Sequence, residues 1–191
     1  MKKFFTLIFT LCVLVVSANA QDTYANYSMN YFNDSYLVDI SDDKIFMEIE
    51  GERESYFLIK REDVWMYQLS LKTMKSKYVE YKNIAIENNI TSINKDMFAP
   101  PTGIISGIAW MGAKAYIDLN PFLNGRFKVL DGKYLYIISG KAVAEDNEYI
   151  DNKYYFVISS EEEFDTLISI FDESNINAYL DSLKKVEELF N

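Results

Sequence analysis

The sequence of 191 residues contains one cysteine and no histidine. Without histidine it can form no Ser-His-Asp triad, no Cys-His nucleophile pair and no zinc site built on imidazole. Three prolines and seven glycines leave few interruptions, and no low-complexity linker separates two halves. These shortages favour a single domain and exclude several common hydrolytic chemistries.

The first twenty residues have the pattern of a secretory signal peptide. The basic pair Lys2-Lys3 precedes 13 residues without a charge, Phe4–Val16. The sequence Ser-Ala-Asn-Ala at 17–20 supplies an A-x-A site, so we expect cleavage after Ala20 and a mature domain of residues 21–191. The apolar run is too short to span a bilayer, although an uncleaved anchor is the alternative. Cys12 lies inside the run, not at the cleavage point, so we expect no lipoprotein.

Acidic residues outnumber basic ones in this chain. The formal net charge is -10, and it becomes -12 when the two positive charges of Lys2 and Lys3 leave with the signal peptide. Nucleic acid and anionic membranes would repel such a protein, so we expect neither as a partner. No later stretch is long and apolar enough for a transmembrane helix. We expect an exported protein, periplasmic or extracellular, without a cofactor.

Alternating apolar residues predict strands in the first third of the chain, and a longer period follows them. The strands are expected at Tyr36–Ile40, Ile45–Glu50 and Tyr56–Lys60, with turns at 41–43 and 51–53. Residues 21–34 form either a loose N-terminal arm or a first edge strand. A period of 3.6 then predicts an amphipathic helix over 62–87. Its apolar face comprises Val64, Tyr67, Leu71, Met74, Tyr78, Tyr81 and Ala85.

The second half predicts further strands and two helical segments. Residues 94–102, which include Pro100-Pro101, predict a loop. Asp131-Gly132 is typical of a tight hairpin turn. Ser160 and Glu163 form an S-x-x-E capping box before a helix, and a last helix follows a break at 174–175. The strands are expected at 104–111, 115–119, 126–130, 134–138 and 154–159.

Two segments of the chain resemble each other. Tyr56–Lys72 aligns with Tyr155–Phe171 without gaps, with five of 17 positions identical. A duplicated strand-helix unit, with both helices on one sheet, would explain the similarity. An aromatic strand that feeds a capped helix would also give this pattern, and both explanations stay open.

Acidic residues supply the remaining catalytic and metal-binding candidates. Glu48 and Glu50 lie two apart on a predicted strand, so they share one face, and two carboxylates suffice for glycoside hydrolysis. Met47 and Ile49 alternate with them, which favours a solvated acidic face over a catalytic pair. Two acidic clusters could suggest calcium, but neither has the spacing of a calcium loop, and turn formation explains them better. These clusters are Asp146, Glu148 and Asp151, and Asp39, Asp42 and Asp43. We therefore expect no metal site.

Tyrosines are the most promising binding residues. Exposed Tyr and Trp side chains stack on sugar rings and anchor protein interfaces. Most aromatics of this chain fall on predicted strands or on the helix face, where burial explains them. Tyr24, Tyr27, Tyr31 and Tyr149 lie where we expect exposure. They are the candidate binding residues.

The segment Tyr78–Asn89 (YVEYKNIAIENN) follows a strand-helix entry and precedes a Tyr-rich β half. In this it resembles small secreted proteins of unknown function from gut Bacteroidetes. The resemblance would cover most of the mature chain, and it implies export across the inner membrane of a Gram-negative cell. It implies no catalytic activity.

These patterns together predict an α+β domain. We expect an antiparallel sheet of about six to eight strands, with a long helix and a C-terminal helical segment packed on one face. The expected function is a non-enzymatic binding or interaction module whose partner is an unidentified protein or glycan. The alternatives are a small carboxylate-dependent glycan hydrolase and a structural component of an envelope assembly.

Overall fold

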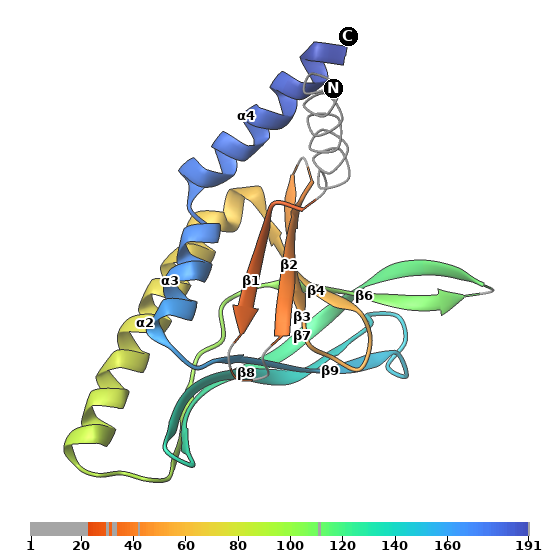
Figure 1. Ribbon diagram of the computed structural model, residues 1–191. Coiled ribbons are helices and arrows are strands. Elements are labelled where there is room, and N and C mark those ends of the chain that lie inside the picture. Colours follow the sequence, from red (N-terminus) through yellow and green to blue (C-terminus); the bar gives the residue numbers. More distant parts are fainter. Residues whose placement is uncertain (1–22, 30, 32–33, 42, 111, 191) are drawn as a thin grey trace, which may run out of the picture.

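The computed structural model describes residues 23–29, 31, 34–41, 43–110 and 112–190 (Figure 1). Within these residues the chain forms an α+β domain with one antiparallel sheet, which confirms the predicted fold class. The sheet has nine strands, more than the six to eight expected. The signal peptide expected at 1–20 and the cleavage after Ala20 lie outside the described residues.

The sheet is built mainly from strands that neighbour one another along the chain. Its order is β1-β2-β3-β4-β6-β7-β8-β9, and β5 pairs with β7 outside this path. The strands of the first half are β1 (Ala25–Met29), β2 (Asp34–Ile40), β3 (Lys44–Ile49) and β4 (Ser55–Lys60). Those of the second half are β5 (Ile93–Met97), β6 (Gly103–Trp110), β7 (Ala113–Leu130), β8 (Lys133–Val143) and β9 (Asp151–Ile158).

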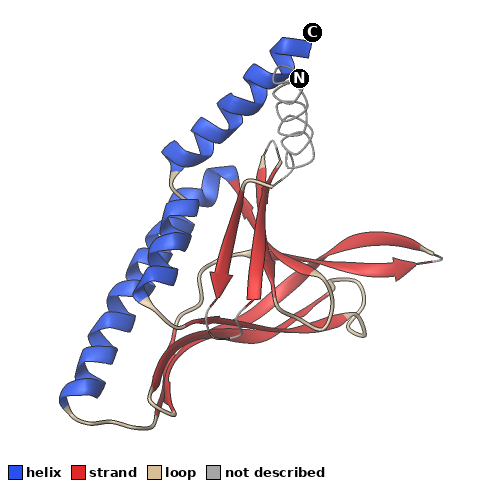
Figure 2. Cartoon of the chain, in the orientation of Figure 1, coloured by secondary structure: helices blue, strands red, loops and turns tan. Residues whose placement is uncertain are grey.

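Helix α2 (Val64–Glu87) follows a short 3-10 turn at Arg61–Asp63, close to the predicted start at residue 62. Every residue of the predicted face is buried except Tyr81, which is partly buried. Tyr78 shows how the helix is fixed to the sheet, because its hydroxyl donates to the carbonyl oxygens of Tyr134 (3.1 Å) and Ser159 (2.8 Å). Helices α2 and α3 (Glu161–Ile170) lie side by side along the sheet (Figure 2).

The break between the last two helices lies earlier than predicted. Helix α4 begins at Glu173 and ends at Phe190, so the predicted break at 174–175 falls inside its first turn. The reason is Asp172, whose carboxylate accepts hydrogen bonds from the backbone N–H (3.0 Å) and the hydroxyl of Ser174. Asp172 therefore caps the helix, and the polar residues after it are helical. Figure 1 shows α4 rising away from the sheet.

The expected loop at 94–102 was partly wrong, because Ile93–Met97 forms strand β5 against the second half of β7. Two strands predicted at 115–119 and 126–130 are one strand, β7, which continues through Pro121. The segment 21–34 contains strand β1, paired with β2, so the edge-strand alternative holds for the described residues. Asp131 and Gly132 have φ values of 50° and 74°, as the predicted tight turn between β7 and β8 requires.

The sheet curls until its two halves touch. The loop after β3 forms a bridge from Gly51 to Tyr154 of β9, and Glu52 N–H donates to the Asn152 side chain at 3.0 Å. Asn152 also donates to the buried Ser55 hydroxyl at 3.1 Å, which bonds Ser106 at 2.9 Å. This network satisfies the polar groups that the closure buries. It also holds the 50–54 loop in place.

The two similar segments do adopt the same strand-helix arrangement, β4 with α2 and β9 with α3. Their strands agree in burial, since Phe57 and Phe156 both lie in the core. The helices agree only in part, because Leu71 and Ile170 are both buried whereas Trp65 is 64% exposed and its counterpart Phe164 is fully buried. The ungapped correspondence therefore holds for the strands and only in part for the helices, and the origin of the similarity stays open.

Candidate functional site

An open hollow of about 660 Å³ lies where β7 and β8 separate, beside the loop between β8 and β9. We call it the aromatic hollow because two exposed aromatic side chains line it. Phe122 is 60% exposed and Tyr149 is 87% exposed. The lining residues are Asn120, Phe122, Lys141, Val143, Ala144, Glu145, Glu148 and Tyr149.

Strand register explains why the strand residues of the aromatic hollow face the same way. Phe122 pairs with Lys141 and Asn120 pairs with Val143, and directly paired residues of antiparallel strands share a face. These four positions therefore form one patch at the end of the β7-β8 ladder. Two lie on β7 and two on β8, so the patch rests on paired strands that fix its spacing.

The β8–β9 loop presents the second aromatic residue. Ala144 N–H donates to Ile150 carbonyl oxygen at 2.9 Å, which closes the base of the loop. Inside it, Asn147 accepts twice, at its carbonyl oxygen from Ile150 N–H (2.9 Å) and at its side chain from Tyr149 N–H (3.1 Å). These bonds hold the backbone so that Tyr149 extends into solvent. The loop contributes two carboxylates to the same hollow, Glu145 and Glu148.

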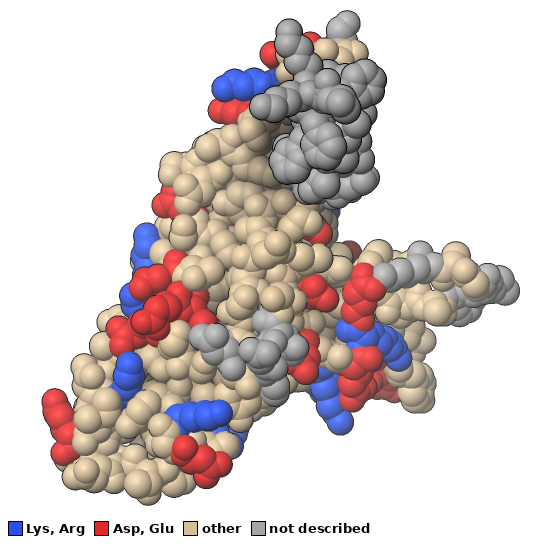
Figure 3. All heavy atoms as spheres, viewed as in Figure 1, with Lys and Arg blue, Asp and Glu red and all other residues tan. Residues whose placement is uncertain are grey.

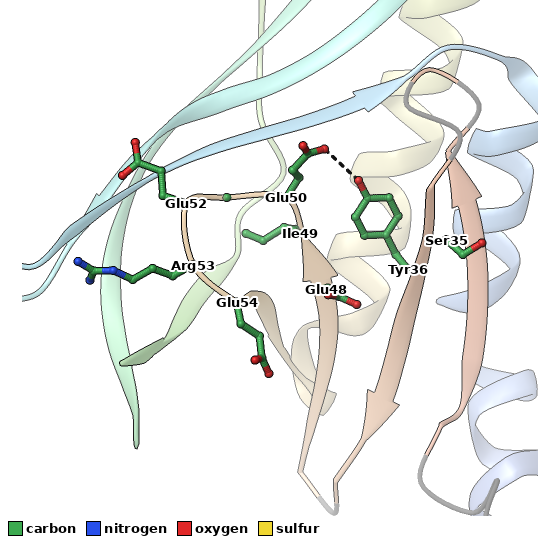
Figure 4. Close-up of a pocket in the computed structure, with 9 residues that line it drawn as sticks. Ser35, Tyr36, Glu48, Ile49, Glu50, Glu52, Arg53 and Glu54 are labelled. Atoms are coloured by element: carbon green, nitrogen blue, oxygen red, sulfur yellow. Dashed lines mark hydrogen bonds between the residues drawn. The ribbon is translucent and has the colours of Figure 1, made fainter. Parts of the chain in front are cut away.

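A second hollow, of about 460 Å³, is acidic and lies between β2, β3 and the 50–54 loop (Figure 4). We call it the acidic hollow. The predicted pair Glu48 and Glu50 lines it, together with Glu52, Glu54 and Arg53. Glu50 accepts a hydrogen bond of 3.1 Å from the Tyr36 hydroxyl. Figure 4 shows Glu52 and Glu54 directed away from each other, so the four carboxylates do not converge on one point.

The acid-out arrangement predicted for β3 is confirmed. Met47 and Ile49 are buried, Glu48 is half-buried and Glu50 is exposed. Among the described residues, no group of three or more acidic, Cys or His side chains is placed to hold a metal ion. One member of the Asp39 cluster, Asp42, lies outside the described residues.

The four candidate tyrosines lie in different places, and Tyr149 lines the aromatic hollow. The expected exposure is confirmed for Tyr149 and wrong for Tyr27, which is 2% exposed. Tyr27 is buried because β1 is a paired strand, so its side chain packs against Tyr36 with ring centroids 5.2 Å apart. Tyr24 and Tyr31 are partly buried. The ring of Tyr24 lies 5.0 Å from that of Tyr179 on α4.

Sequence reasoning missed Phe122 and Lys141 as site residues. Phe122 lies between the two strands predicted at 115–119 and 126–130, in a stretch with Pro121 and Asn124 that was assigned to neither strand. An aromatic residue inside such a polar stretch was the available signal.

The surface view shows acidic and basic side chains mixed on one face, without a continuous basic area (Figure 3). No helix in the described part of the chain is long and apolar enough to cross a membrane. Comparison with protein-family models, with curated proteins and with solved structures finds no match to this chain. The geometry of the two hollows therefore carries the functional argument.

Proposed function

We propose that the protein is an exported, non-enzymatic binding module and that the aromatic hollow binds a glycan. The observation that carries this proposal is the exposure of Phe122 and Tyr149 at one hollow that also has charged side chains. Large apolar rings are normally buried, and two of them on one open site are typical of a binding surface. The export signal of the sequence supports a ligand outside the cytoplasm.

The remaining side chains favour a sugar over an apolar ligand. The apolar faces of a sugar ring stack on aromatic rings, and its hydroxyls need donors and acceptors nearby. Lys141 and Asn120 supply donors, and Glu145 and Glu148 supply acceptors. The hollow is open, so an oligosaccharide could lie across it without any movement of the backbone.

Isothermal titration against a panel of neutral and acidic oligosaccharides tests the proposal. We expect one ligand class to bind, and Phe122→Ala or Tyr149→Ala to weaken binding by about tenfold to a hundredfold, since one stacking contact contributes about 1–3 kcal/mol. Trp65→Ala is the matched control, because Trp65 is a 64% exposed aromatic on α2. Glycan binding that both hollow variants retain would contradict the assignment of the site.

A carboxylate-dependent glycan hydrolase is the second candidate. It is favoured by one observation, that Glu48 and Glu50 line the same hollow with the Tyr36 hydroxyl bonded to one of them. The test is glycan turnover by Glu48→Gln and Glu50→Gln. If the unsubstituted protein cleaves a glycan and both variants do not, the hydrolase is supported. If both variants cleave it at the same rate, Glu48 and Glu50 are not the catalytic pair. A structural role in an envelope assembly stays a prediction, with co-purification of an envelope component as its test.

A further inference from the structure

Strand β7 has an edge along which strand pairing stops early. It is 18 residues long and pairs with β6 through Ala113–Leu119. On its other side, pairing with β8 runs from Leu130 only as far as Asn120, opposite Val143. Among the described strands, none continues the line of β8 along Ala113–Leu119. Figure 1 shows this β6-β7 hairpin extending away from the other strands.

The register shows which backbone groups point to that edge. Leu130 and Lys133 flank a two-residue turn, and such flanking residues exchange hydrogen bonds in an antiparallel hairpin. Because orientation alternates along a strand, the even-numbered positions of β7 direct their backbone groups to the β8 side. The same alternation directs the odd-numbered positions to β5 and β6. The open part of the β8 side therefore presents positions 114, 116 and 118.

The sequence of this segment, AKAYIDL, is complementary to itself. Its two charges are Lys114 and Asp118, placed symmetrically about Tyr116. In a two-fold antiparallel pairing centred on Tyr116, each Lys114 stands opposite Asp118 of the second copy. On the alternate positions small residues stand opposite large ones, Ala113 opposite Leu119 and Ala115 opposite Ile117. Opposite charges and complementary sizes across strands both stabilise pairing.

We propose that two copies of this chain dimerise through the Ala113–Leu119 edge of β7, which joins their sheets into one. The even-numbered positions that point to the edge are then the hydrogen-bonded pairs of the new ladder. A two-stranded hairpin is at best marginally stable alone, and Lys114 is the only charged residue between Met97 and Ile117. Pairing with a second copy gives the β7 strand of this hairpin a neighbouring strand on both sides. An open edge of this kind is otherwise a risk for uncontrolled association.

Sedimentation equilibrium of the protein, purified as the cell produces it, tests the proposal. We expect the parent to have twice the monomer mass, and Lys114→Glu or Asp118→Lys to raise the dimer dissociation constant at least tenfold by placing like charges opposite each other. An equimolar mixture of the two single variants should form dimers again, because each mixed pair has opposite charges at both positions. Lys184→Glu, on exposed α4, is the matched control. Dimers that both single variants keep at the parent affinity overturn the proposal.

Cross-linking tests the register without any change of charge. Hydrogen-bonded pairs of antiparallel strands have Cα atoms about 5.5 Å apart, within disulfide range. In a Cys12→Ala background, Tyr116→Cys should therefore form a disulfide dimer under mild oxidation, and the exposed Tyr149→Cys should not. A parent that stays monomeric up to about 100 μM overturns the proposal, as does equal cross-linking of both variants. A monomeric parent leaves the edge to a strand from another protein.

Discussion

Glu163 is the clearest case of a residue whose sequence context predicted its structure. Its carboxylate accepts hydrogen bonds from Ser159 N–H (2.5 Å) and Ser160 N–H (3.2 Å), and its own N–H donates to the Ser160 hydroxyl at 3.1 Å. The capping box is thus confirmed, because a cap depends on residues three apart and on nothing distant. Tyr27 is the opposite case, since its burial depends on a partner strand and on Phe156. The centroids of the Tyr27 and Phe156 rings lie 6.2 Å apart.

Removal of this cap should be costly. Glu163 is only 4% exposed, so Glu163→Ala leaves two backbone N–H groups without acceptors at the start of α3. We expect the free energy of unfolding, measured by urea titration, to fall by about 2–3 kcal/mol. Glu188→Ala, at an exposed position of α4, should change it by less than about 0.5 kcal/mol. Equal effects of the two substitutions would show that the box contributes nothing.

Gly125 decides how closely β5 approaches β7. A Cβ added to this residue would lie 1.9 Å from the Phe98 carbonyl oxygen, which also accepts the Tyr136 hydroxyl at 2.7 Å. Gly125→Ala should therefore displace the segment after β5 and lower the free energy of unfolding by about 3 kcal/mol or more. At Gly103 the nearest atoms to an added Cβ are 3.4 Å away, and Gly103→Ala should cost less than about 1 kcal/mol. Thermal unfolding of both variants distinguishes these outcomes.

Among the helices and strands, those with a regular amphipathic pattern could be predicted from the sequence. The others depend on which strands pair with each other. Helix α2 was predictable because seven apolar residues repeat at its period. Strand β5 was not, because in INKDM four of five residues stay exposed and no alternation marks it. Pro121 suggested a chain break, yet it lies in β7. Its missing N–H would point to the β5-β6 side, in the gap between Gly125, which pairs with the last residue of β5, and Leu119, which pairs near the start of β6.

The aromatic hollow follows from the same pairing. The sequence alone indicated Tyr149, because loop position and composition suggest exposure. It could not indicate Phe122 and Lys141 as neighbours, since they are 19 positions apart and meet only through the β7-β8 register. The loop residue of the site could therefore be predicted from its neighbours in the sequence, and the strand residues could not.

Helix α4 contacts the domain through Ile176, the partly buried Leu180 and Tyr179, whose ring lies 5.0 Å from that of Tyr24. Ile176 is fully buried, and no other described residue of this helix is. Ile176→Ala should therefore release α4 from the body while the sheet stays folded. In hydrogen exchange we expect faster exchange across 173–190 and unchanged protection in α2. Leu189→Ala, at an 81% exposed position, should leave α4 protection unchanged, and a loss of protection in α2 as well would contradict local release.

At the scale of the whole molecule, the absence of histidine and the burial of tyrosine set the pH dependence of stability. With no histidine in the chain, no side chain with an ordinary pKa between about 5 and 8 can titrate. Burial raises the pKa of Tyr27 and Tyr67 well above the usual value of about 10. Burial likewise raises the pKa of Tyr78 and Tyr136. These hydroxyls ionise more easily in the unfolded chain than in the folded one.

Stability should therefore be constant from about pH 6 to 9 and fall above about pH 10. The pKa of each buried tyrosine is higher in the folded chain than in the unfolded chain. Its contribution to the free energy of unfolding is therefore fully present below the unfolded pKa and is lost as the pH rises toward the folded pKa. Each tyrosine that ionises only after unfolding lowers the free energy of unfolding by about 1.4 kcal/mol per pH unit in this range. Urea midpoints between pH 6 and 11, with tyrosinate absorbance at 295 nm, measure the slope. Tyr67→Phe should reduce the slope by about one tyrosine's share, because the Tyr67 hydroxyl is buried. A fall in stability that begins below pH 8, or a slope that Tyr67→Phe leaves unchanged, would show that groups other than the buried tyrosines control the alkaline limit.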